Sequence, residues 1–368
     1  MIKKTSIGFL VNYILGLIFI FLNRHILPKK FFYDSLHIKT LLSNPYSFCL
    51  FNSFLNTAYF YKMFGFSTSS SCYLVAIFSY SLCFVCLILF LRRINFIFNF
   101  KMFLIFFILN FILSIYVGQY SKEVIAFIIV TLLISIEKNN NLVIYFMLSS
   151  PIFLFYTLFF RIYWILIFYF FFIIKICWFY KPRALNYFTK ITLFFVLTVI
   201  LYTTIYYTTN KYLTSSRYIV NLCRIGSPDA QSILVNPLHN TSVITDLLNT
   251  ILVFIYLIFP FKLFLLKMKL EYIIFVVWQI FNSLFFIKIV YYLSKRKNLI
   301  KRWDQTTNCI TLIIAFTIVQ AMFEPDYGSF LKHQVVLFPA YIYLIFIYFK
   351  TKKYCKLLRC LYESNTYS

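Results

Sequence analysis

Residues 309–322 read CITLIIAFTIVQAM, residues 323–333 read FEPDYGSFLKH and residues 334–349 read QVVLFPAYIYLIFIYF. The first and third strings are almost wholly apolar, as helices that cross a membrane must be. The middle string carries two acids, a lysine and a histidine beside a turn-forming proline and glycine. The pattern predicts two membrane helices joined by a polar turn. Further apolar runs of similar length occur along the rest of the chain.

The composition excludes an ordinary soluble globule. Of the 368 residues, 62% are hydrophobic and 12% charged, whereas soluble domains have about 45–50% apolar and about 25% charged residues. A net charge of +25 would suggest nucleic acid as the partner of a soluble protein. Here the basic residues lie in short segments between apolar runs, which is the pattern that orients a chain in a bilayer. We therefore expect membrane lipid, and no nucleic acid, as a partner.

Apolar runs predict an all-α, polytopic transmembrane helical bundle with about ten spans. The first run has a basic start and no small-residue cleavage site, which predicts an uncleaved signal anchor. No internal repeat, linker or soluble segment is visible, so residues 1–368 are expected to form a single integral membrane domain. The predicted spans are 6–22, 72–91, 102–117, 124–136, 142–160, 162–180, 191–209, 271–293, 309–322 and 334–349.

The distribution of basic residues predicts that both termini are cytoplasmic. Lysines precede the first span, and a basic cluster at 295–302 and a basic tail follow later spans. Residues 247–266 are apolar enough to span, but a span there would move that cluster and the tail outside. Pro260 interrupts this run, so we expect it to be re-entrant or to lie at the outer surface. Residues 23–71 and 210–270 then become extracytoplasmic loops with interfacial or re-entrant helices.

This topology places most of the acids and all the histidines on the outer side, including the polar turn. Two neighbouring carboxylates, Glu324 and Asp326, tend to split their pKa values and leave one able to accept a proton near neutral pH. Gly328 is expected to take a left-handed conformation that sharpens the turn. Lys332 and His333 follow within one helical turn and are candidates for binding a phosphate. The structural alternative is a capped loop in which Asp326 accepts backbone amides.

Other outer residues have the chemistry of an anion or sugar site. Lys122 follows a predicted capping serine, where a helix start can hold an anionic leaving group, while Glu123 suits the helix dipole. Asp34 follows the first span and is a candidate catalytic acid, or else a solvated loop acid. Arg217 and Arg224 lie in the large outer loop and suit diphosphate and sugar hydroxyls, or are simply surface arginines.

Several signatures are absent from the sequence. It has no phosphate-binding Walker loop, no dinucleotide fingerprint and no zinc-protease or serine-hydrolase motif. His239 has no acid or cysteine at the spacing of metal ligands. We therefore expect no cofactor and no protein-bound metal.

An outward Ser-Lys-Glu turn at 121–123 and the late turn at 323–333 resemble the bacterial Wzy-type polymerases of O-antigen and capsule repeat units. The resemblance covers the whole length in topology and size, but the motifs are short. Family members often carry an arginine followed eleven residues later by glycine in an outer loop, and this chain has no such pair. The resemblance implies a substrate of undecaprenyl-diphosphate-linked oligosaccharide, used without a nucleotide sugar or a required metal. It also implies a chain-length regulator and a flippase as partners.

The predicted function is that of a membrane glycosyltransferase, a polysaccharide polymerase in the bacterial inner membrane. Catalytic roles are assigned to Asp326, Glu324 and Asp34, and substrate-binding roles to Arg217, Arg224, Lys122, Glu123, Lys332 and His333. Two alternatives stay open. A lipid-linked oligosaccharide flippase would need charge within the spans, where Lys175 lies, and a membrane acyltransferase acting on polysaccharide would need a histidine-centred site such as His333.

Overall fold

Regular secondary structure is helical throughout the residues that the structure describes. The structure is a computed structural model, and it describes residues 2–44, 47–136, 142–179, 186–224, 232–261, 263, 270–301 and 303–366. Its one extended feature in these ranges is an isolated antiparallel bridge between Ile233 and Asp326. The all-α prediction is therefore confirmed.

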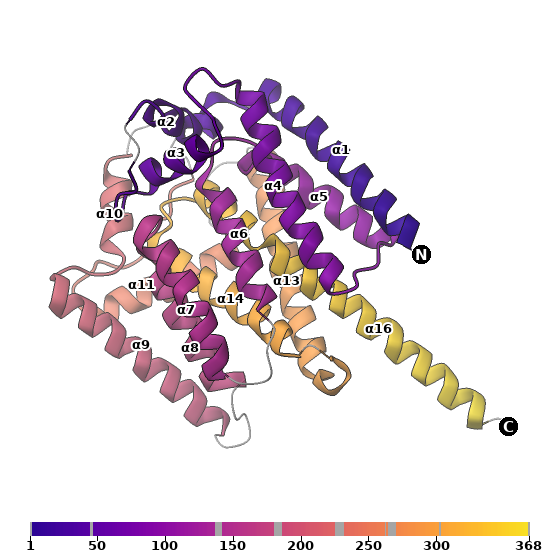
Figure 1. The fold of residues 1–368 in the computed structure, drawn as a ribbon. Coiled ribbons are helices and arrows are strands. Elements are labelled where there is room, and N and C mark those ends of the chain that lie inside the picture. The colour runs from indigo at the N-terminus through magenta and orange to yellow at the C-terminus, as the bar shows by residue number, and fades with distance from the viewer. Residues whose placement is uncertain are drawn as a thin grey trace. The chain divides into compact units, whose positions relative to one another are not determined.

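Figure 1 shows the helices along the chain. In chain order they are α1 (Ile2–Ile26), η1 (Lys29–Phe32), α2 (Tyr33–Leu41), α3 (Ser53–Met63), α4 (Cys72–Arg93), α5 (Phe100–Tyr116), α6 (Lys122–Ser135), α7 (Leu142–Phe159), α8 (Trp164–Ile174), η2 (Lys175–Phe179), α9 (Tyr187–Thr209), α10 (Ser215–Leu222), α11 (Val243–Ile258), α13 (Leu270–Ser294), η3 (Lys297–Leu299), α14 (Trp303–Phe323), α15 (Tyr327–Gln334), η4 (Val335–Leu337) and α16 (Phe338–Thr366).

Within the described ranges, seven helical stretches are long and apolar enough to cross a membrane. They are Thr5–Ile26, Cys72–Arg93, Leu142–Phe159, Tyr187–Thr209, Tyr272–Ser294, Asp304–Phe323 and Tyr327–Cys355. Three further apolar helices are shorter, namely Phe100–Tyr116, Trp164–Phe179 and Val243–Ile258. The multi-pass membrane character is thus confirmed, whereas the count of about ten spans and the side on which each terminus lies stay predictions.

The two predicted loops contain helices too short to cross a bilayer. Residues 23–71 form η1, α2 and α3, and α10 lies in the second loop. Helix α11 ends at Ile258, two residues before Pro260, as expected because proline cannot continue a helical hydrogen-bond ladder. The interfacial or re-entrant placement of these helices stays a prediction.

Contacts divide the chain into two compact units. Unit 1 comprises Met1–Ile165 with Lys332–Phe346, and unit 2 comprises Leu166–Leu331 with Ile347–Ser368. Each unit therefore combines one long stretch of chain with a shorter stretch that follows residue 331. The prediction of a single integral membrane domain stays a prediction.

In unit 1, α1 packs along α4 and α5. A Cβ atom on Gly16 would lie 1.9 Å from the Tyr80 hydroxyl oxygen, so only glycine permits this approach. The Asn110 amide donates to the Asn12 carbonyl (3.0 Å), and Tyr80 donates to Asn110 Oδ1 (3.3 Å). Small residues and interhelical hydrogen bonds are the usual means by which membrane helices associate.

A second cluster in unit 1 holds α2 and α3 against the turn that precedes α6. It buries Ile38, Leu42, Ala58, Tyr61, Val75 and Tyr120. Because Tyr120 belongs to that turn, the cluster fixes where α6 begins relative to α2. The charged residues described below sit at this junction.

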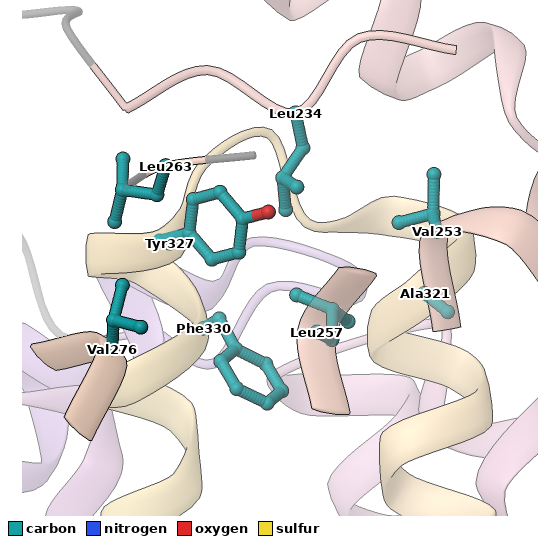
Figure 2. Close-up of a cluster of buried hydrophobic side chains, with 8 residues drawn as sticks. All are labelled: Leu234, Val253, Leu257, Leu263, Val276, Ala321, Tyr327 and Phe330. Carbon is teal, nitrogen blue, oxygen red and sulfur yellow. The ribbon is translucent and has the colours of Figure 1, made fainter. Parts of the chain in front are cut away.

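In unit 2, an apolar cluster anchors the turn that follows α14. Figure 2 shows its members converging from α11, α13, α14, α15, the segment before α11 and residue 263 between α11 and α13: Leu234, Val253, Leu257, Leu263, Val276, Ala321, Tyr327 and Phe330. Backbone hydrogen bonds reinforce it, from Leu234 N to Pro325 O (2.8 Å) and from Tyr327 N to Ser232 O (3.2 Å). The turn is therefore a fixed part of unit 2.

Segment η2 is a short π-helix that continues α8 in unit 2. Such segments are rare and are found often at functional sites. Lys175 opens it, is 8% exposed and donates a hydrogen bond to Asn308 Oδ1 on α14.

Candidate functional site

The start of α6 is held by its own side chains. Ser121 Oγ accepts from the Glu123 amide (3.2 Å) and donates to Glu123 Oε2 (3.1 Å). The Tyr61 hydroxyl accepts a hydrogen bond from the Ser121 amide (3.1 Å). The predicted serine cap is thus observed, and it leaves the first residues of α6 in fixed positions.

Glu123 is fully buried and doubly paired. Its Oε1 lies 2.6 Å from a terminal nitrogen of Arg161 and 3.2 Å from His333 Nε2. Burial alone would raise the pKa of the Glu123 carboxyl, but Arg161 and Lys332 outweigh it and hold the pKa well below its usual range. Glu123 is therefore a permanent anion that positions the cations around it.

Lys122 is buried without a carboxylate partner among the described residues. It is 8% exposed, and its Nζ lies 3.5 Å from the centroid of the Phe54 ring, a cation–π contact. Burial, together with the neighbouring Arg161 charge, lowers the pKa of Lys122 to about 8. A buried ammonium whose side-chain contact is a ring and not a carboxylate is suited to receive an anion.

Asp34 and Lys332 form an ion pair at the more open edge of this group. Lys332 Nζ donates to Asp34 Oδ2, and the two side chains are 19% and 42% exposed for lysine and aspartate respectively. Burial raises the pKa of the Asp34 carboxyl, but Lys332 and Lys122 together leave it below its usual value. Asp34 therefore interacts with both lysines.

We call these six residues the unit 1 charge cluster. The cluster comprises Asp34, Lys122, Glu123, Arg161, Lys332 and His333. Two carboxylates face three permanent or near-permanent cations and a histidine, so the cluster carries net positive charge. Such a site can bind an anion and can also offer a carboxylate to a hydroxyl group.

Arg217 lies in unit 2 and is fully buried. Its Nε and NH2 groups donate to Asn236 Oδ1, and its NH1 group donates to the Ala321 carbonyl near the end of α14. Burial lowers the pKa of this guanidinium to about 10. These contacts fasten the loop before α11 to α14 and leave no face of Arg217 open to solvent, which favours a positioning role.

Asp326 and Arg224 pair with each other in unit 2. The distance from Arg224 NH1 to Asp326 Oδ2 is 2.6 Å. Asp326 Oδ1 also accepts from the Ser329 amide (2.7 Å), so it caps the first turn of α15. Glu324, two residues earlier, is buried. The turn therefore has the capped-loop arrangement, in which Asp326 accepts a backbone amide. A catalytic role for Glu324 or Asp326 stays a prediction.

The prediction that Gly328 takes a left-handed backbone conformation is wrong. Gly328 lies in the first turn of α15, and Gly65 is the glycine with positive φ among the described residues. The turn is made instead by Pro325 and by backbone pairing with residues 232–234. Gly328 matters for space, because a Cβ there would lie 3.1 Å from Asp326 Oδ1.

The structure sorts the nine predicted site residues into two groups. Unit 1 brings together Asp34, Lys122, Glu123, Lys332 and His333, while unit 2 contains Arg217, Arg224, Glu324 and Asp326. Sequence reasoning does not single out Arg161, because it lies between two apolar runs with no other charged residue beside it. Its place in the middle of a Phe-Phe-Arg-Ile-Tyr sequence gives no sign that Glu123 is its partner.

No group of three or more histidine, cysteine or acidic residues suited to a metal occurs in the portion of the chain that the structure describes. No protein-family model, curated protein or solved structure matches this chain.

Proposed function

We propose that the protein is a membrane glycosyltransferase that joins lipid-diphosphate-linked oligosaccharide units into a polysaccharide. The unit 1 charge cluster is the observation that carries this proposal. Transfer of a sugar requires cations to stabilise the departing diphosphate and a carboxylate to orient or deprotonate the attacking hydroxyl. The cluster supplies both, in a chain rich in membrane helices where a lipid-linked substrate would reside.

The roles follow from burial and pairing. Lys122 and Lys332 contact the diphosphate, because neither is held by a fully buried acid. Asp34 is the exposed carboxylate and acts on the hydroxyl. Glu123, Arg161 and His333 keep the lysines in place. In unit 2, Asp326 and Arg224 remain candidates for binding sugar hydroxyls.

The proposed location is the outer face of a bacterial inner membrane, with about ten spans and both termini in the cytoplasm. The support is the excess of basic residues expected on the inner side and the polar loops expected outside. O-antigen, capsule and exopolysaccharide synthesis are the processes that use such a reaction.

The test uses purified protein in lipid vesicles with lipid-diphosphate-linked repeat units. Longer glycans are the expected product, and Lys122→Gln should lower kcat/KM about 100-fold or more, as loss of one charge-stabilising donor does in other enzymes. Cells lacking the protein should accumulate single lipid-linked units. Unchanged chain length in those cells would contradict the proposal.

A transporter of the same lipid-linked unit is a second candidate, favoured by one observation. Lys175 is buried in a π-helical segment, and charged residues inside membrane segments often mark a transport path. Vesicle assays separate the two, because a transporter moves the unit across the bilayer without lengthening it.

A further inference from the structure

The two carboxylates of the unit 1 charge cluster differ in how firmly they are held. Glu123 is fully buried and contacts Arg161, His333 and Ser121. Asp34 is 42% exposed, and Lys332 is the one side chain that the structure shows binding its carboxylate among the described residues. The Asp34–Lys332 pair is more exposed than the Glu123–Arg161 pair, and ion pairs weaken toward about 0.2–1 kcal/mol as they become exposed, so the Asp34 contact exchanges with other anions more readily.

The two lysines near Asp34 also differ. Lys332 forms an ion pair with Asp34. Lys122 is more than nine-tenths buried, and its ammonium group contacts the face of the Phe54 ring. Lys332 contacts Asp34 directly, and the charge of Lys122 also lowers the pKa of the Asp34 carboxyl. The Asp34 carboxylate is therefore bound by one ammonium group and lies in the electrostatic field of a second.

We propose that Asp34 is an exchangeable counter-ion that occupies a diphosphate-binding position. Its carboxylate holds Lys332 until the phosphate oxygens of a ligand replace it on Lys332 and add a partner for Lys122. The exchange rests on the proposed function only in naming a diphosphate as the ligand. No bond in the protein is made or broken: one anionic acceptor leaves Lys332 and another takes its hydrogen bonds.

The exchange has a consequence for the order of events. Binding of the diphosphate releases the Asp34 carboxylate from its lysine, so the acid becomes free to act on a hydroxyl only when substrate is present. Without ligand, Asp34 neutralises Lys332, and the excess positive charge of the cluster is confined to Lys122 and His333. Helix α2, which carries Asp34, is the element that responds.

Isothermal titration of the detergent-purified protein with inorganic pyrophosphate tests the proposal. Asp34→Asn removes the internal competitor, so the Kd should fall about threefold to tenfold, as expected when a larger fraction of the protein is ready to bind. Asp34→Ala should behave in the same way, and Lys332→Gln should weaken binding in either background. A second arm with a polyprenyl diphosphate in nanodiscs reports whether the lipid-linked form takes the same position.

The matched control is Asp304→Asn, which makes the same change in net charge in the first turn of α14 and should leave the Kd within about twofold. Unchanged or weaker pyrophosphate binding by both Asp34 variants, with unfolding temperature and gel-filtration profile as in the wild type, overturns the exchange. Failure of both the wild type and the Asp34→Asn variant to bind pyrophosphate also overturns the exchange.

The outcomes separate this inference from the proposed function. Tighter pyrophosphate binding by Asp34→Asn without any glycan lengthening by the wild type supports the exchange and refutes the polymerase. Glycan lengthening by the wild type, with Asp34→Asn binding pyrophosphate as the wild type does, supports the polymerase and refutes the exchange.

Discussion

Lys122 should make anion binding sensitive to pH above neutrality. Its pKa in the folded protein is lowered from 10.5 to about 8, so the charged fraction falls as the pH rises through that value. Pyrophosphate binding should weaken between pH 7 and pH 9. Arginine stays charged in this range, so Lys122→Arg should abolish the weakening.

The same titration series checks this expectation, with the Kd measured at each pH for both proteins. Because pyrophosphate itself gains charge over this range, the wild-type curve is compared with that of the arginine variant rather than with a flat line. Parallel curves for the two proteins would mean that Lys122 does not titrate here.

Glu123 should matter for stability more than any exposed acid. Glu123→Gln leaves the Arg161 guanidinium buried without a counter-ion, and breaking a buried pair in this way costs about 3–5 kcal/mol. The folded-state pKa of Glu123 lies below its ordinary 4.5, so its contribution is present above pH 4.5 and is lost as the pH falls through the folded pKa. A lowered unfolding temperature in detergent is the expected result.

A double variant provides the control. Arg161→Gln combined with Glu123→Gln removes both charges and should recover part of the lost stability, because no unpaired charge remains. Strictly additive losses would indicate that the two side chains do not act as a pair.

At the scale of elements, the close approach of α1 to α4 depends on Gly16. Gly16→Leu should separate the helices, since even a Cβ would lie 1.9 Å from the Tyr80 oxygen. We expect a loss of about 2–3 kcal/mol of stability, typical of overpacking. Ile18→Leu, at a side chain 46% exposed on the same helix, should have little effect. Unfolding temperatures of the two variants make the comparison.

Local sequence was sufficient to predict most elements and some of their ends. The cap at Ser121, the break near Pro260 and the helical turn carrying Lys332 and His333 each depend on a few neighbouring residues. The position of α6 as a potential span is less well defined, because its length of 14 residues is below that of an ordinary membrane helix. The position of α6 relative to the bilayer depends on the helices packed against it more than on its own sequence.

The pairing of charged residues could not be predicted in the same way. Glu123 finds Arg161 and His333, and Asp34 finds Lys332 at a separation of 298 residues. Such contacts depend on how several helices pack, and nothing in the sequence around each residue encodes its partner. The sequence therefore indicated which residues were chemically able, and the structure indicates which of them act together.

At the scale of the whole molecule, the predicted topology can be tested at two native thiols. Cys223 is exposed and lies in the loop expected outside, whereas Cys355 belongs to α16, whose end is expected in the cytoplasm. An impermeant maleimide applied to intact cells should modify Cys223 and leave Cys355 unmodified until the membrane is permeabilised. Cys223→Ser identifies the signal, and labelling of Cys223 solely after permeabilisation would reverse the orientation.

The second segment of unit 1, Lys332–Phe346, is synthesised long after its first segment, Met1–Ile165. At about 5–20 residues per second, the 298 residues between Asp34 and Lys332 take roughly 15–60 s to synthesise. Once Arg161 has been made, Glu123 and Arg161 can neutralise each other, while Lys122 and Asp34 wait for Lys332. The unit 1 charge cluster is therefore completed only after residues 332 and 333 have been made, and a message truncated before codon 332 would yield an insertion intermediate that lacks Lys332 and His333.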